Sequence, residues 1–160
     1  MRAAMQAPSA GNQQPWKFVV VRDKQILKSV PNFHPYAQMV PEAELAILVC
    51  GDTSKEKYKG YWLQDWSAAT ENMLIAIQAY GLGGVWLGIH PDEQRIQDMR
   101  IQDMRIQDMR TLFHISESNV VPLALVPVGY AKHVRTTSQE RYNHENIFLN
   151  IWGNAFDPMK

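Results

Sequence analysis

Apolar residues gather in four short blocks along the chain, each bounded by polar residues, glycine or proline. The blocks predict four β-strands: "WKFVVVRD" (16–23), "LAILVCGD" (45–52), "GGVWLGI" (83–89) and "VVPLALVPVGYA" (120–131). The β-branched run predicts that the first strand is buried on both faces at Phe18 to Val21, and the near-continuous second block predicts a central strand. Pro122 and Pro127 predict that the fourth strand has an irregular ladder or lies near a sheet edge.

A second pattern, with apolar residues three or four positions apart, predicts helices between these strands. The clearest helix begins near Tyr61, ends at Gly81 and carries one apolar stripe: Trp62, Trp66, Ala69, Met73 and Tyr80. Shorter helices are predicted at 1–7, at 24–30 with Asp23 as its N-cap, and from 91 onward. Strands separated by helices in one domain, 1–160, indicate an α/β or an α+β fold, and periodicity does not choose between them.

Composition narrows the range of functions. The chain has 160 residues, 46% of them hydrophobic, and its 16 basic and 16 acidic side chains balance, which disfavours nucleic acid or an anionic membrane surface as a partner. The apolar runs are much shorter than the roughly 20 residues of a membrane span. Cys50 is the single cysteine, so an intrachain disulfide is excluded, and we expect a reducing, cytoplasmic location.

No side-chain constellation for hydrolysis or metal binding is found in the sequence. The five histidines are scattered without metal-ligand spacing, and the residues around Ser9 and Ser67 do not form a nucleophile elbow. The cluster "GLGG" follows a predicted helix rather than a strand, so it is not a Rossmann phosphate loop. We therefore predict no metal site and no catalytic side chain.

Four segments, in order, resemble the nitroreductase family of FMN-dependent oxidoreductases: "APSAGNQQPWKFVVV", "LAILVCGD", "QDWSAATENMLIAIQAYGLGGVWLGI" and "VVPLALVPVGYA". The resemblance implies a three-layer α+β fold with a mostly antiparallel sheet flanked by helices. It implies a homodimer in which the C-terminal extension, 132–160, reaches toward the partner subunit. It also implies that flavin takes electrons from NADH or NADPH and passes them to nitroaromatic or quinone acceptors in a ping-pong cycle, so that the cofactor carries the chemistry.

The resemblance also assigns cofactor-binding residues. Those in the first loop are expected to contact FMN from the partner subunit: Pro8, Ser9, Ala10 and Asn12. The segment Trp86, Leu87 and Gly88 is expected to lie beside the flavin ring, with backbone N–H groups toward it. Arg141 matches a cation that reaches the phosphate of FMN. An ordinary turn, a plain buried strand and a solvated surface charge are the respective alternatives.

Two departures from the family pattern point to a different outcome. Family members usually carry an Arg-Arg-Ser-x-Arg segment about thirty residues before the first loop, and this sequence begins after that point. Losing two or three charge-assisted phosphate contacts, each worth about 1.5 to 3 kcal/mol, would leave FMN binding weak or absent. The alternative function is therefore a truncated, non-enzymatic nitroreductase-like scaffold or oligomer.

The second departure is the tandem repeat "RIQDMRIQDMRIQDMR", 95–110, where relatives would carry one copy. With no glycine or proline it is expected to stay helical, although Ile96, Ile101 and Ile106 are five residues apart and form no single stripe. Ten extra residues turn a helix by about 1000°, about 80° short of three whole turns, so a continuous helix is expected to rotate its downstream face off the core. We expect a protruding or register-shifted helix that changes how subunits assemble.

Overall fold

The computed structural model describes residues 1–90, 99–132 and 142–155, with the backbone alone for 99–105. Its helices and strands are, in chain order, α1 (Arg2–Met5), β1 (Trp16–Val21), α2 (Lys24–Ser29), β2 (Leu45–Asp52), α3 (Trp62–Ala79), β3 (Gly83–Gly84), β4 (Leu87–Gly88), α4 (Met99–Leu112) and β5 (Val120–Gly129). Short 3₁₀ turns lie between them: η1 (Ala10–Asn12), η2 (Val30–Asn32), η3 (Val40–Glu42), η4 (Thr53–Lys55) and η6 (His144–Asn146).

The strands form one sheet in the order β1-β2-β5-β3, and β4 also pairs with β5. Every recorded pairing is antiparallel, which confirms the predicted α+β class. The predicted third strand, 83–89, is present as two short pieces along one edge of β5, with Gly83 opposite Gly129 and Leu87 opposite Leu125. The chain between the two pieces, at Val85 and Trp86, leaves the ladder and becomes part of the site described below.

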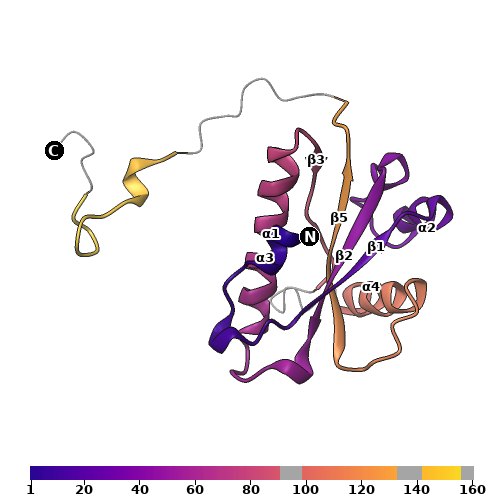
Figure 1. Ribbon diagram of the computed structural model, residues 1–160, viewed down its shortest axis with the longest axis horizontal. Coiled ribbons are helices and arrows are strands. Elements are labelled where there is room, and N and C mark those ends of the chain that lie inside the picture. The colour runs from indigo at the N-terminus through magenta and orange to yellow at the C-terminus, as the bar shows by residue number, and fades with distance from the viewer. Residues whose placement is uncertain (91–98, 133–141, 156–160) are drawn as a thin grey trace.

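Helices cover both faces of the sheet, giving three layers (Figure 1): α1 and α3 lie on one side, and α2 and α4 on the other. The alternation along β2 explains why its sequence is almost entirely apolar. Ile47 and Val49 pack in the α3 core, whereas Ala46, Leu48 and Cys50 pack in the core beneath α2 and α4. The prediction of a central strand at 45–52 is confirmed.

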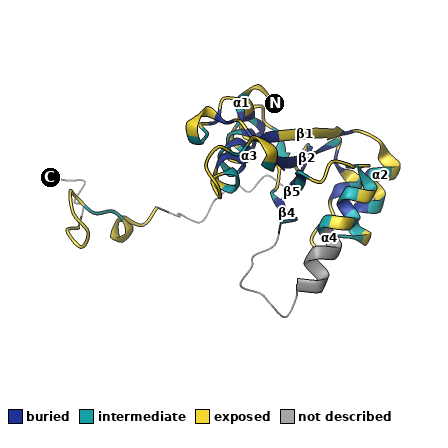
Figure 2. Cartoon of the chain, turned by 90° about the horizontal axis from the view of Figure 1, so that it is seen from below, coloured by how far each residue is buried: buried dark blue, intermediate teal, exposed yellow. Residues whose placement is uncertain are grey.

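The exposure of β1 corrects one prediction. Val19 and Val20 have 38% and 50% of their surface exposed, so the strand is not buried on both faces from Phe18 to Val21 (Figure 2). Among the described residues β1 lies at one end of the strand order and pairs with β2 alone, and Val19 and Val20 are not covered by the helix layers. A run of valines fits any pleated surface and does not report how many layers cover it.

β5 is central rather than near an edge, because β2 pairs along one side of it and β3 and β4 along the other. The predicted irregularity is confirmed. Val49 lies opposite Ala124 and Cys50 opposite Pro122, so Leu123 is an extra residue in a β-bulge. The bulge reverses the alternation, and Leu123 and Ala124 both pack in the α3 core.

The helices also follow their sequence signals. Asp23 caps α2 by accepting hydrogen bonds from the backbone N–H groups of Gln25 and Ile26. Gly81, with φ of 70°, ends α3 as predicted, since a left-handed residue after the last turn is most easily glycine. None of the helices within the described parts of the chain is long and apolar enough to cross a bilayer.

The repeat is helical from Met99 onward, as predicted, and its first four residues lie outside the described ranges. The third copy packs on the sheet: Met109 is fully buried, and the Arg110 guanidinium donates to the carbonyl oxygens of Val120 (2.5 Å) and Glu117 (3.0 Å). The expectation that the downstream face turns off the core is therefore wrong. The short connection to β5 and the Arg110 bonds fix the C-terminal end of α4, where the third copy packs. An effect of the repeat on assembly stays a prediction.

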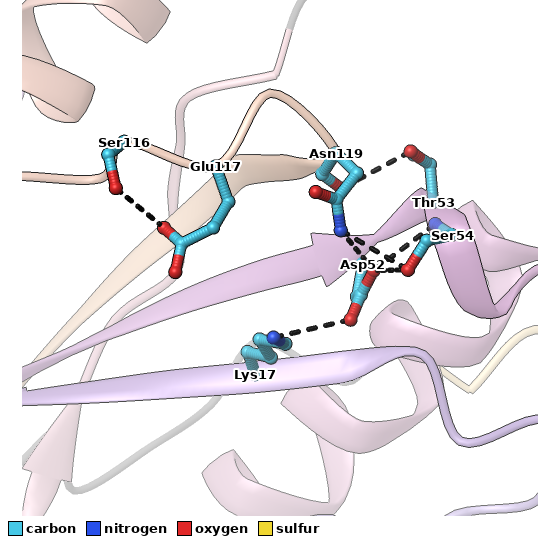
Figure 3. A network of polar contacts seen from close by, with 7 residues as sticks. All are labelled: Lys17, Asp52, Thr53, Ser54, Ser116, Glu117 and Asn119. Atoms are coloured by element: carbon cyan, nitrogen blue, oxygen red, sulfur yellow. Dashed lines mark hydrogen bonds and ion pairs between the residues drawn. The ribbon is translucent and has the colours of Figure 1, made fainter.

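A polar network joins the far end of β2 to β1 and β5 (Figure 3). The Asp52 side chain is 4% exposed and accepts hydrogen bonds from Ser54 N (3.1 Å), Ser54 Oγ (2.5 Å) and Asn119 Nδ2 (2.7 Å). Lys17 Nζ lies 3.3 Å from its other oxygen. Burial alone would raise the pKa of Asp52, but the bonds from Ser54, Asn119 and Lys17 outweigh it and hold the pKa at about 2.

Candidate functional site

The segment Val85 to Gly88 is an exposed length of backbone anchored by buried side chains. Leu87 is 4% exposed and packs in the core beneath α4, while the half-buried Trp86 ring packs against Trp66 of α3, tilted by 53° with 5.1 Å between centroids. The side chains of Trp86 and Leu87 anchor the segment, while Val85 and Gly88 are exposed. This is the arrangement expected for a segment that contacts a ligand through peptide groups.

No atom of the described residues occupies the space next to the Cα of Gly88 where a side chain would lie. A Cβ built on this residue would meet no atom within 4 Å. Its φ is not positive, so the backbone conformation does not require glycine either. By contrast, a Cβ on Gly51 would lie 2.6 Å from Trp62. Gly60, Gly81 and Gly153 are equally open, and Gly88 differs from them because it lines a cavity.

A cavity of about 710 Å³ lies against this backbone. Two segments far apart in the sequence line it: His34, Pro35, Tyr36, Gln38 and Met39 on one side, and Val85, Trp86, Leu87 and Gly88 on the other. His34, 3% exposed, joins the two segments through a hydrogen bond between its Nε2 and the Gly88 carbonyl oxygen, 2.9 Å away. The cavity has the size of a small-molecule site.

The first loop has a strained, fixed shape. Gly11, Asn12 and Gln14 have positive φ values of 54°, 55° and 47°. The loop is closed on itself by hydrogen bonds from Gln14 N to Ser9 Oγ (3.0 Å) and from Asn12 N to the Ser9 carbonyl oxygen (2.9 Å). Pro8 is exposed and Ala10 half-buried. Non-glycine residues in the left-handed region persist where surrounding contacts enforce them, and they are enriched at ligand-binding loops.

Two buried polar residues hold this loop against α3. The Asp65 carboxylate accepts hydrogen bonds from Ala10 N (2.9 Å) and Gln13 Nε2 (2.5 Å). The Gln13 side-chain oxygen in turn accepts from Lys57 N (2.8 Å). Neither Asp65 nor Gln13 was among the residues predicted for the site. The sequence does contain a signal for Asp65, because a charged residue three positions after Trp62 interrupts the apolar stripe of the helix, and a buried charge needs a partner.

The structure does not bring the two predicted cofactor segments into one pocket of a single chain. The cavity at Trp86 to Gly88 is lined by residues 34–39 and not by the loop 8–12. Within the described residues the segments are connected indirectly, because Asp65 holds the loop and the next residue, Trp66, packs against Trp86. Arg141, predicted to contact the phosphate, lies outside the described residues.

The residues present fit a flat cofactor beside Trp86 to Gly88. The open space at Gly88 would be filled by a ring approaching the backbone. In addition, Trp66 Nε1 is the one buried side-chain nitrogen or oxygen in the described ranges that lacks a hydrogen-bond partner, and its ring packs against Trp86. Cys50 is unsuited to redox or nucleophilic work, because burial raises the pKa of its thiol to about 12.

The C-terminal segment, 142–155, lies apart from the sheet and helices in Figure 1. The hydrogen bonds of its described residues are all within the segment, and the Phe148 ring packs against Trp152, tilted by 43° with 4.5 Å between centroids. Trp152 is 88% exposed and Ile151 71%. Such large apolar side chains are rarely left in water, so a surface to cover them is expected.

Known proteins that are similar to this chain in sequence and in fold identify its family. Residues 1–45 match the model described as "Nitroreductase family". A protein of Archaeoglobus fulgidus named "Putative NADH dehydrogenase/NAD(P)H nitroreductase" is 41% identical over 155 residues, covering 95% of this chain and 83% of that protein. A crystal structure from Clostridium acetobutylicum matches with a TM-score of 0.82 at 36% identity, over 94% of this chain and 84% of the other.

A further crystal structure, of a Desulfovibrio desulfuricans protein in complex with FMN, matches with a TM-score of 0.72 at 26% identity, over 94% of this chain and 81% of the other. The predicted fold and the oxidoreductase class of the enzyme agree with these relatives. The chain belongs to the nitroreductase family.

Proposed function

We propose that this chain is an FMN-dependent oxidoreductase that takes electrons from NADH or NADPH and delivers them to nitroaromatic or quinone acceptors. Family membership supports the reaction class, and the FMN complex of a relative supports the cofactor. When bound, FMN supplies the redox chemistry by accepting two electrons from the nicotinamide and releasing them to the acceptor. The protein's task is to bind, orient and shield the reactants.

The observation that carries the proposal is the unused space at Gly88 beside a cavity of about 710 Å³. Here the backbone of Trp86, Leu87 and Gly88 binds the flavin ring edge. Fixed N–H groups there favour negative charge on the ring, because preorganised dipoles in a partly dry site need no rearrangement. Residues 34–39 form the opposite wall, where an aromatic acceptor stacks.

The loop residues Pro8, Ser9, Ala10 and Asn12 serve the same site from a second copy of the chain. This part of the proposal is supported by the lining of the cavity, which does not include the loop of the same chain, so a loop that contacts the cofactor would come from another copy. A homodimer also provides a surface for the exposed Trp152 and Ile151. Arg141 binds the FMN phosphate, and the protein works in the cytoplasm.

The test begins with the purified protein. FMN is added, unbound flavin is removed by gel filtration, and the flavin content, NADH and NADPH oxidation with a quinone or nitroaromatic, and mass by light scattering are measured. We expect stoichiometric FMN, turnover and a dimer. No flavin uptake and no turnover at high FMN would show the proposal to be wrong and leave the non-enzymatic scaffold as the remaining interpretation.

A variant pair locates the cofactor. Gly88→Val fills the open space, so we expect the Kd for FMN to rise at least about tenfold while the melting temperature of the flavin-free protein stays within a few degrees of the unmodified protein. Ala79→Val adds bulk at an exposed position outside the cavity and should leave the Kd unchanged. Equal FMN affinity in both variants would place the ring elsewhere.

A further inference from the structure

His34 is a buried histidine whose two ring nitrogens both have partners. Its Nδ1 lies 3.3 Å from the backbone N of Tyr36, and its Nε2 lies 2.9 Å from the Gly88 carbonyl oxygen. The Tyr36 N–H can only donate, so Nδ1 must offer a lone pair. The ring hydrogen is therefore on Nε2, which donates to the Gly88 carbonyl. The neighbouring turn thus selects one tautomer of the ring.

This hydrogen bond completes a clamp on a single peptide unit. The carbonyl of Gly88 and the N–H of Ile89 belong to the same planar group, and they point in opposite directions because the bond is trans. The Ile89 N–H donates to the Leu123 carbonyl oxygen of β5, 2.9 Å away. The peptide is therefore held by β5 on one side and by His34 on the other, which fixes the plane of the backbone.

The clamp matters because Gly88, unlike its neighbour Leu87, has no side chain that anchors it in the core. The strand has two residues and a ladder partner, β5, on one edge. Gly88 has no side chain to pack, and no atom lies within 4 Å of the Cβ position. In the described ranges, His34 is the only side chain that hydrogen-bonds to residues 85–88.

We propose that His34 is a positioning residue: its Nε2–H, in the tautomer selected by the Tyr36 N–H, orients the Gly88 peptide and with it the backbone of Trp86 to Gly88. The consequence for FMN rests on the proposed function. The clamp itself does not depend on the proposed function, because its hydrogen bonds are present in the flavin-free chain. His34 also lines the cavity, so the clamp joins the two walls of the site.

Two variants separate the donor at Nε2 from the rest of the ring. His34→Gln places an amide N–H near the position of Nε2 and keeps the donor to Gly88. His34→Asn reaches only the position of Nδ1 and loses that donor. Amide hydrogen exchange of the flavin-free protein is measured for residues 83–90 and, as an internal control, for residues 45–52. We expect exchange at 83–90 to accelerate at least about fivefold in His34→Asn and to be nearly unchanged in His34→Gln, with 45–52 unaffected in both.

The same variants are then titrated with FMN. We expect the Kd to rise about tenfold in His34→Asn and less than about threefold in His34→Gln, since a lost neutral hydrogen bond corresponds to a factor of this size. If His34 only fills space, the two variants will behave alike in both assays, which overturns the proposal. If the unmodified protein takes up no FMN, the proposed function fails, and the exchange experiment alone decides on the clamp.

The ring tautomer gives a readout that requires no substitution. ¹⁵N–¹H correlation spectra of the imidazole rings in the unmodified protein should show His34 with its hydrogen on Nε2 and a lone pair on Nδ1. This result supports the clamp even if His34→Asn does not fold. A neutral ring with its hydrogen on Nδ1 would contradict the clamp, because Nε2 would then have no hydrogen to donate to the Gly88 carbonyl, and a hydrogen on both nitrogens would contradict the selection of the tautomer by the Tyr36 N–H.

Discussion

Replacing Asp52 by Asn tests the polar network that joins β1, β2 and β5. The ordinary pKa of an aspartate is 3.8, and in the folded protein the pKa of Asp52 is lowered to about 2. At about 1.4 kcal/mol per pKa unit, the difference corresponds to about 2.5 kcal/mol of stability at neutral pH. Because the Lys17 side chain is 47% exposed, its share is screened by solvent, and we expect a measured loss of about 1 to 2 kcal/mol.

The sign of the pH dependence follows from the lowered pKa. Asp52 contributes its full stabilisation above the unfolded value of 3.8, and the contribution is lost as pH falls through the folded value of about 2. At about pH 3 roughly half of it remains. The difference in unfolding free energy between the unmodified protein and Asp52→Asn should therefore shrink by about half between pH 7 and pH 3.

The assay is urea unfolding followed by tryptophan fluorescence at one fixed protein concentration, because association also changes apparent stability. Asp23→Asn is the matched control: it removes one acidic charge at an exposed helix cap, where asparagine caps equally well, and should cost little at either pH. A cost for Asp52→Asn that is the same at both pH values would refute the reasoning, since the charge of Asp52 would then contribute nothing.

Three further outcomes are expected. Cys50 should not react with thiol reagents at mildly alkaline pH until the protein unfolds, because burial raises its pKa to about 12; rapid labelling of the folded protein would contradict this. Gly51→Ala should lower the free energy of unfolding by about 1 to 3 kcal/mol, since its Cβ would lie 2.6 Å from Trp62, and equal stability in urea would refute the close contact. Met109→Ala should cost about 2 to 5 kcal/mol and Ile75→Ala, at an exposed helix position, little; equal melting temperatures would show that the third repeat copy does not pack.

Much of the fold could be predicted from the sequence, because local patterns have local causes. The continuous apolar run at 45–52 marks a strand with helices on both faces, and Asp23 and Gly81 mark helix ends by satisfying backbone groups and by adopting a left-handed conformation. The ordered segments around the first loop and the "GLGGVWLGI" stretch indicated the family. In each case the signal depends on residues within a few positions of one another.

Contacts between distant residues had no such signal. The edge position of β1 and the central position of β5 depend on which strands pair, and a strand pattern reports faces but not neighbours. Three identical repeat copies cannot be distinguished by sequence, and the structure shows the third copy packed through Met109 next to the tie of Arg110 to Val120.

For the site, the sequence by itself determined the resemblance to the family, and that resemblance implies the two backbone segments expected to meet the cofactor, because each match depends on residues close together in the chain. The tertiary structure alone decided what holds them. Asp65 reaches Ala10 across 55 residues and His34 reaches Gly88 across 54. Such partners are brought together by the packing of α3 and of the turn at 30–37 onto the sheet, and a pattern with a period of two or 3.6 residues contains no information about that distance.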